Sequence, residues 1–176
     1  MKIWIDILFL TILYIFVFYQ SWKKQGKQIF LVKTLMYIYL GFVLHLTLMP
    51  VLTSLPFVFN HPYHPMNLIP FAGVMNNRMN FIRQVGFNII MTIPFGFLFP
   101  LTKKYSNNNL FLKTIISTFL LSLCIELLQP LLHEFRVGDI TDLITNTTGG
   151  VIGYILYLLF YLVVQKRLLL INNNQH

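Results

Sequence analysis

Five long apolar runs constrain the fold of this chain more than any other feature of its sequence. They lie at about 3–20, 29–53, 85–101, 110–132 and 140–164. An α-helix rises about 1.5 Å per residue, so about 20 apolar residues cross the roughly 30 Å hydrocarbon core of a bilayer. The sequence therefore predicts an all-α, polytopic helix bundle in the cell membrane, with about five transmembrane helices.

The composition supports a single membrane domain. Only 10% of the residues are charged, whereas about 25% are charged in average soluble domains. The five runs occupy most of the 176 residues, so we predict one membrane domain over 1–176 and no separate soluble catalytic domain. The single cysteine excludes a disulfide scaffold.

The positions of the cations predict how the bundle is oriented, because short cytoplasmic loops collect Lys and Arg. If the loop after the first run is cytoplasmic, that side holds Lys23, Lys24, Lys27, Lys33, Lys103, Lys104, Lys113, Lys166 and Arg167. The outer side then holds only Lys2, Arg78, Arg83 and Arg136. We expect the N-terminus outside and the C-terminus in the cytoplasm. The net charge of +8 then reflects topology and anionic lipid, not binding of nucleic acid.

Two loops face outward in this arrangement, a short one at 133–139 and a long one at 54–84. The long loop is rich in proline and aromatic residues, so it is too apolar for a free linker and unsuited to a long helix. We expect it to lie on the membrane surface and to cap the outer end of the bundle.

The acidic residues cluster where the fourth and fifth helices meet. All but one of the five lie between residues 126 and 142, namely Glu126, Glu134, Asp139 and Asp142. Ser122, Glu126 and Gln129 are spaced i, i+4, i+7 on one face of the fourth helix, with His133 at i+11, and Asp139, Asp142 and Asn146 form a similar pattern in the fifth. A carboxylate in hydrocarbon costs at least about 2.5–3.5 kcal/mol, so these groups must face the bundle interior, a partner or water.

Depth and charge together predict a polar pocket in the outer leaflet. Glu126 and Asn146 each lie about six residues from the short loop, roughly 9 Å below the outer surface, so they can face each other. Asn88 lies near the outer end of the third helix. We expect Arg136 to bridge two carboxylates with bidentate hydrogen bonds. The remaining acids leave room for a cationic ligand, a metal ion or a protonated acid.

Small residues predict close helix packing beside this pocket. Gly149, Gly150 and Gly153 follow Asn146, and Pro94 with Gly96 interrupts the third helix, so we assign these five residues to packing. Two groups of residues could supply metal ligands: His61 with His64, and Glu126, Asp139 and Asp142 with His133. Neither has a recognised ligand spacing, so we predict no metal and no cofactor. No role is assigned to His61, His64, His133 or Glu134.

In their order and spacing these residues resemble the VanZ-like family of bacterial membrane proteins. The matching elements run from 67 to 153: Asn67-Leu-Ile-Pro-Phe71, Asn88, Ile93-Pro-Phe-Gly-Phe97, Ser122, Glu126, Gln129, Arg136, Asp139, Asp142, Asn146, Gly149, Gly150 and Gly153. The resemblance implies lowered susceptibility to the lipoglycopeptide teicoplanin. It supplies no reaction, so no catalytic residue is assigned.

Three interpretations of the pocket follow from the residues and the resemblance. We expect it to bind a membrane lipid or lipid-linked cell-wall precursor by its headgroup, with eight candidate ligand-binding residues: Asn88, Ser122, Glu126, Gln129, Arg136, Asp139, Asp142 and Asn146. The alternative is a membrane-embedded enzyme that modifies such a lipid through Glu126, Asp139 and Asp142. A third interpretation is an accessory bundle that assembles with a partner protein through its glycine stripe.

Overall fold

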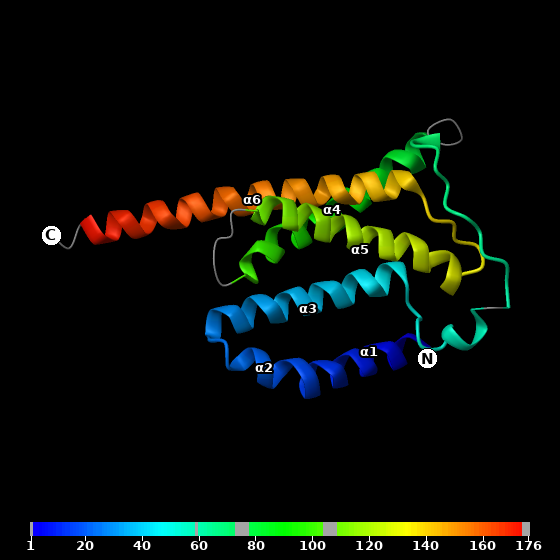
Figure 1. The fold of residues 1–176 in the computed structure, drawn as a ribbon, viewed down its shortest axis with the longest axis horizontal. Helices are drawn as coiled ribbons and strands as arrows, with labels where there is room; N and C mark the ends of the chain where they lie inside the picture. The colour runs from blue at the N-terminus through cyan, green and yellow to red at the C-terminus, as the bar shows by residue number, and fades with distance from the viewer. Residues whose placement is uncertain (1, 59, 73–77, 104–108, 174–176) are drawn as a thin grey trace.

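Five long helices make up the computed structural model, which describes residues 2–58, 60–72, 78–103 and 109–173 (Figure 1). The first is built of α1 (Lys2–Leu13), the π-helical η1 (Tyr14–Tyr19) and α2 (Gln20–Lys23), and the others are α3 (Lys27–Thr47), α4 (Arg78–Leu101), α5 (Leu110–Leu132) and α6 (Ile140–Asn173), with a short 3-10 turn, η2 (Leu55–Phe57), after α3. Each long helix is apolar enough to cross a membrane. The predicted all-α bundle with five spans is confirmed.

Three helix ends differ from the predicted boundaries by more than three residues. The fifth helix continues to Asn173 and does not end at 164. The second helix ends at Thr47 and not at 53, because Pro50 cannot donate a backbone hydrogen bond and disfavours helical geometry at the residue before it. The third begins at Arg78 and not at 85, because four polar residues in its first two turns interrupt the apolar run: Arg78, Asn80, Arg83 and Gln84. The outer loop therefore runs from 48 to 77.

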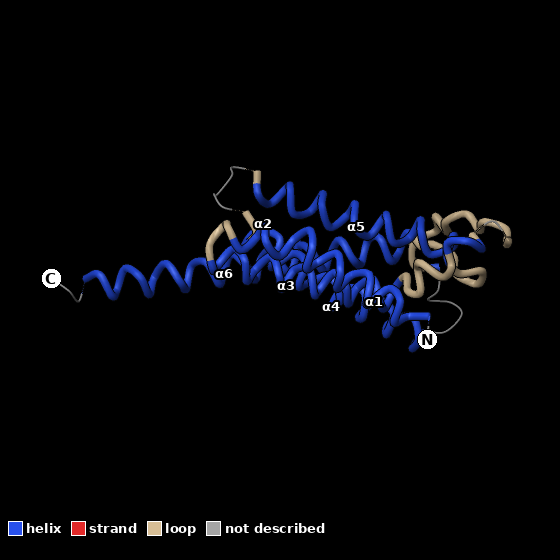
Figure 2. The backbone as a smooth tube through the Cα atoms, turned by 90° about the horizontal axis from the view of Figure 1, so that it is seen from below, coloured by secondary structure: helices blue, strands red, loops and turns tan. Residues whose placement is uncertain are grey.

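The helices form two groups. The segment α1–α2 pairs with α3 as a hairpin, while α4 packs along α6, and α5 packs against both (Figure 1). The N-terminus and the loops at 48–77 and 133–139 lie together at one end, and the C-terminus extends from the other (Figures 1 and 2). Lys23, Lys33 and Lys113 belong to helix ends far from these loops. Lys104 lies outside the described residues.

The backbones of α4 and α6 are in direct contact through glycine. A Cβ atom on Gly96 would overlap the backbone of Gly150, and one on Gly153 would overlap the carbonyl of Ile93. The Thr92 hydroxyl donates across this contact to the carbonyl oxygen of Asn146, at 2.7 Å. The glycine stripe is thus occupied within the molecule, which argues against its use as a surface for a partner protein.

A buried carboxylate in α1 accepts hydrogen bonds from the backbone that follows α3, and so connects the start of the first hairpin to its end. Asp6 in α1 is only 3% exposed, and it accepts hydrogen bonds from the backbone N–H groups of Val51 at 2.6 Å and Leu52 at 2.9 Å. These N–H groups lie just beyond the proline that ends α3. The carboxylate therefore satisfies donors that a helix would otherwise have paired.

Candidate functional site

A stripe of polar side chains runs along one face of α5. Its members are all buried, with exposed fractions of 0–7%: Thr114, Thr118, Ser122, Glu126 and Gln129. The hydroxyls of Thr114 and Thr118 donate to carbonyl oxygens one turn earlier in the same helix, at 2.8 and 2.9 Å. The remaining three side chains are left to interact with other helices. Only these three residues were predicted as a polar face; Thr114 and Thr118 extend the stripe toward the start of α5.

A cavity of about 920 Å³ lies between α3, α4, α5 and α6 at the end where the outer loops gather. Six of the eight candidate residues line it: Asn88, Glu126, Gln129, Arg136, Asp142 and Asn146. Pro94 also lies on its wall. The structure therefore brings most of the candidates together at one place.

Ser122 does not line the cavity but contacts Asn146, which does. Its Oγ accepts a hydrogen bond from Asn146 Nδ2 at 2.9 Å, in a fully buried contact between α5 and α6. Asn146 is 1% exposed, and its Oδ1 has no hydrogen-bond partner in the described part of the chain. The amide is thus oriented by Ser122, and Asn146, with its unpaired acceptor, is one of the residues that line the cavity.

Glu126 is held by the turn that connects α5 to α6. Its Oε2 accepts a hydrogen bond from the backbone N–H of Asp139 at 3.0 Å. The turn approaches closely because residue 138 is glycine: a Cβ there would lie 2.6 Å from the carbonyl oxygen of Glu126. The side chain is 3% exposed, so its carboxylate has a fixed position in a buried setting.

Asp139, also a candidate ligand-binding residue, does not line the cavity. Its Oδ1 accepts from the backbone N–H of Thr141 at 2.7 Å, the N-cap contact of α6, and its Oδ2 accepts from Asn67 Nδ2 at 3.1 Å. Both oxygens are therefore occupied in holding the start of the helix and the outer loop. The contact of Asp139 with a cavity-lining residue is the hydrogen bond from its backbone N–H to Glu126.

The Asn67–Phe71 segment is attached to the start of α6. Asn67 forms an isolated parallel bridge with Asp139, with its N–H 2.8 Å from the Gly138 carbonyl and its carbonyl 3.0 Å from the Ile140 N–H. The backbone N–H of Phe71 donates to Thr141 Oγ1 at 2.9 Å. This motif positions the turn above Glu126 and contributes no side chain to the cavity.

Arg136 does not bridge carboxylates as expected. It is exposed on the short loop, and no ion pair joins it to an acid among the described residues. One oxygen of Glu126 accepts from the Asp139 N–H, and both oxygens of Asp142 accept from Gln84 Nε2. Arg136 instead lies at the edge of the cavity, which it shares with Arg83.

Three residues of the first turns of α4 complete the cavity, although the sequence predicts a loop at their positions. Gln84 Nε2 lies 3.0 Å from each carboxylate oxygen of Asp142, and Asn80 and Arg83 line the same wall. Asn80, Gln84 and Asn88 are spaced i, i+4, i+8, which is a helical polar stripe. The spacing is present in the sequence, but a prediction of spans from hydropathy does not use the spacing of polar residues.

Contacts from α3 close the other side of the cavity. The Tyr39 hydroxyl donates to the carbonyl oxygen of Met91 at 2.7 Å, one turn before Pro94. Gln129 Nε2 lies 3.4 Å from the carbonyl oxygen of Thr47. Because α3 carries no diagnostic motif, its part in the site was not predicted.

The histidines lie apart from the cavity. His133 Nε2 is 3.1 Å from the carbonyl oxygen of Leu48, and His61 Nδ1 is 3.4 Å from that of Pro62, while His64 and Glu134 are exposed. Within the described ranges, no three His, Cys, Asp or Glu side chains gather as a metal site requires.

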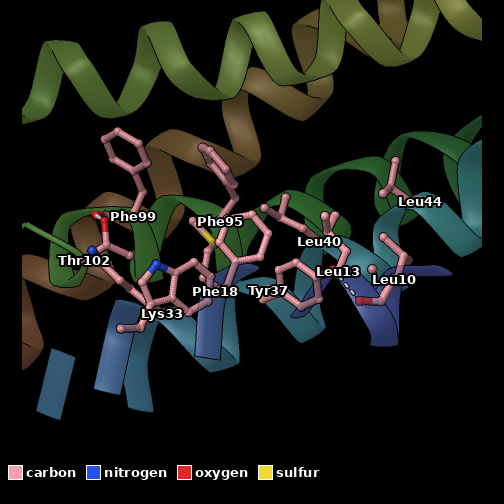
Figure 3. A pocket seen from close by; sticks show the side chains of 13 residues that line it. Leu10, Leu13, Phe18, Lys33, Tyr37, Leu40, Leu44, Phe95, Phe99 and Thr102 are labelled. Carbon is pink, nitrogen blue, oxygen red and sulfur yellow. Dashed lines mark hydrogen bonds between the residues drawn. The ribbon is translucent and has the colours of Figure 1, made fainter. Parts of the chain in front are cut away.

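A second pocket, of about 530 Å³, lies between the first hairpin and α4 (Figure 3). Its wall is apolar, with Leu10, Leu40, Phe95 and Phe99 lining it and Lys33 near Thr102. The Tyr37 hydroxyl donates to the Leu10 carbonyl oxygen at 2.7 Å. No candidate residue belongs to this pocket, and it has no carboxylate to match the first cavity.

Comparison with known proteins gives this architecture a family. A sequence profile described as VanZ/LLP1 matches residues 4–161, nearly the whole chain. The chain belongs to the VanZ/LLP1 family. Protein VanZ of Enterococcus faecium is 35% identical to it over 125 residues, which cover 70% of this chain and 71% of that protein. No solved structure gives a significant match.

Membership of the VanZ/LLP1 family confirms the resemblance stated from the motifs between 67 and 153. It suggests a function of the teicoplanin-resistance type. The five spans and the family membership are together compatible with a bacterial membrane protein.

Proposed function

We propose that this VanZ/LLP1 protein lowers teicoplanin susceptibility by binding a membrane lipid or lipid-linked cell-wall precursor, with the headgroup in the cavity between α3, α4, α5 and α6. The observation that carries the proposal is the composition of that one cavity. Buried carboxylate and amide groups lie in the same space as apolar walls. An amphiphile has the matching combination of a polar head and an apolar chain.

The apolar walls give a lipid a route into the cavity. Phe42 of α3 is 57% exposed, and Phe87 and Ile90 of α4 are each 65% exposed, although all three line the cavity. On membrane-spanning helices such surfaces face lipid. The cavity therefore opens sideways between α3 and α4, so a chain can enter without leaving the bilayer.

Drug susceptibility tests the proposal. The chain is expressed in a teicoplanin-susceptible bacterium, and the minimal inhibitory concentration is compared for the wild type and Glu126→Gln, Arg136→Ala and Asp142→Asn. We expect the three variants to lose most of the protective effect, because each removes a charged group from the cavity. Glu134→Gln is the matched control, since Glu134 is exposed on the same short loop but lies outside the cavity lining. Full protection by all three variants, at wild-type membrane levels, contradicts the proposal.

A membrane enzyme is the second candidate, and one observation favours it. Glu126 and Asp142 line the same cavity from different helices, one held by a backbone N–H and the other by an amide. Two carboxylates in different environments suit general acid and base roles. Lipid mass spectrometry separates the candidates. A new lipid mass that disappears in Asp142→Asn cells assigns an enzyme, whereas unchanged masses with altered susceptibility assign binding.

A further inference from the structure

We infer that the cavity selects a headgroup in which a phosphate is joined to an amine. The phosphate lies at Arg83 and Arg136, and the ammonium lies among Glu126, Asp142 and Asn146. The inference rests on the proposed function, because it names the class of lipid that the same cavity binds.

Within the described residues, the cavity lining includes three acceptor groups that lack a cation, together with one unpaired amide donor, Asn88 Nδ2. Asn146 Oδ1 is unpaired and its side chain is 1% exposed. Glu126 uses one carboxylate oxygen for the Asp139 N–H, and neither Glu126 nor Asp142 has an ion-pair partner among the described residues. An alkylammonium carries three N–H donors and one positive charge, so it supplies what these three acceptors need.

The edge of the cavity has the opposite character. Arg83 from α4 and Arg136 from the short loop both line it, both are exposed, and in the described part of the chain neither is paired with an acid. Guanidinium groups bind phosphate oxygens in bidentate pairs. Two such groups from different elements therefore form a phosphate site at the mouth.

The cavity thus changes from cationic at its edge to anionic in its interior. An aminoalkyl phosphate head matches this order, with its chain leaving between α3 and α4 past Phe42 and Ile90. A head that carries only negative charge would be opposed by Glu126 and Asp142. A quaternary ammonium would satisfy the charge but has no N–H for Asn146 Oδ1.

Lipid competition on the purified full-length protein tests the selection. Native mass spectrometry measures binding of phosphatidylethanolamine, phosphatidylcholine and phosphatidylglycerol with identical acyl chains. We expect phosphatidylethanolamine to bind about tenfold more tightly than the other two. Glu126→Gln should abolish this preference, and Asp142→Asn is measured beside it in case Glu126→Gln does not fold. Arg83→Ala should weaken all three lipids alike, because all contain phosphate, whereas Arg78→Ala on the same helix, outside the cavity lining, should change none.

The outcomes separate this inference from the proposed function. If the wild type binds all three lipids within about threefold and Arg83→Ala weakens each, the amine selection is wrong but lipid binding in the cavity stands. If no lipid responds to Arg83→Ala, Glu126→Gln or Asp142→Asn, the proposed function fails as well. A further arm adds a polyprenyl-diphosphate-linked precursor that bears a free amine. Bound, labelled phosphatidylethanolamine is displaced either by this precursor or by unlabelled phosphatidylethanolamine. If the precursor displaces it at the lower concentration, the precursor is the source of the shared chemistry. If the precursor needs the higher concentration, the source is the phospholipid.

Discussion

Glu126 and Asp139 are both acids of the same motif, yet they have different tasks. Glu126 lies on the cavity wall, whereas both carboxylate oxygens of Asp139 accept hydrogen bonds from the α6 N-terminus and the outer loop. The difference follows from position. A residue that directly precedes a helix can cap it, while one inside a helix points to a neighbouring element. Asp139 therefore acts on the site by positioning the turn that holds Glu126.

Replacing Asp139 should weaken the attachment of the Asn67–Phe71 segment to α6, although the backbone hydrogen bonds of Asn67 remain. We expect Asp139→Ala to lower the free energy of unfolding by about 1–3 kcal/mol, because it removes the N-cap and the bond from Asn67. Asp139→Asn should lose less, since asparagine also caps helices well. Thermal unfolding of the purified protein in detergent, followed by circular dichroism, measures the change. Glu134→Gln in the same loop is the control, and Asp139→Ala as stable as that control contradicts the assigned role.

Helix α4 connects the site to the packing of the bundle. One part of its surface carries Gln84 and Asn88 toward the cavity, and another brings Gly96 against Gly150 in α6. Cavity shape therefore depends on the distance between these two helices. Any side chain at the contact must move α4 and the cavity wall together.

Gly96→Ala tests this dependence, with Gly86→Ala as the matched control in the same helix. A methyl group at 96 meets the Gly150 backbone, which cannot rotate away, so we expect a loss of about 1–3 kcal/mol in unfolding free energy. At Gly86 a Cβ meets nothing within 4 Å, so alanine should be neutral or stabilise by up to about 1 kcal/mol. Chemical or thermal unfolding measures both. Equal stabilities for the two variants would show that α4 and α6 are not in backbone contact.

The helices were predictable and their ends only partly so. Apolar runs define the spans because hydropathy is averaged over about 20 residues. The first turns of α4, from Arg78 to Gln84, fall in the predicted loop because four polar residues interrupt their apolar sequence. Their helical spacing was present, but hydropathy does not detect it. The pairing of Asn67 with Asp139 was not predictable, since it depends on where two distant loops meet in space.

The candidate site was predicted better on α5 and α6 than elsewhere. Glu126 and Asn146 were placed opposite each other by counting residues from one short loop, and both line the cavity. Arg136 was paired with acids because sequence proximity suggested it. The structure gives those acids backbone and amide donors instead, and no sequence pattern reports the direction of a backbone N–H.

The molecule as a whole has two unlike ends. The loops at 48–77 and 133–139 and the N-terminus share one end, while the α2–α3 turn and the C-terminus lie at the other (Figure 1). Arg136, which lines the cavity, belongs to the short loop at the first of these ends. Which end faces the cell exterior is an expectation from the cations. It decides whether the cavity can reach lipid-linked precursors on the outer surface.

Cysteine labelling determines the orientation. In a Cys124→Ser background, we expect an impermeant maleimide to label Glu134→Cys in intact cells, because the positions of the cations predict that the short loop is outside. Lys24→Cys, in the α2–α3 turn, should react only after permeabilisation. The reverse pattern would place the cavity mouth in the cytoplasm and contradict the orientation expected from the positive residues.

The bridge between Asn67 and Asp139 also sets an order for synthesis of the protein. Asn67 is made 72 residues before its partner. At about 5–20 residues per second, the outer loop waits about 4–14 seconds before the segment that fixes it has been translated. Glu126 likewise precedes the turn that holds it. The cavity is therefore complete only when the last helix has entered the membrane, so a chain that stops before α6 lacks the cavity wall formed by Asp142 and Asn146.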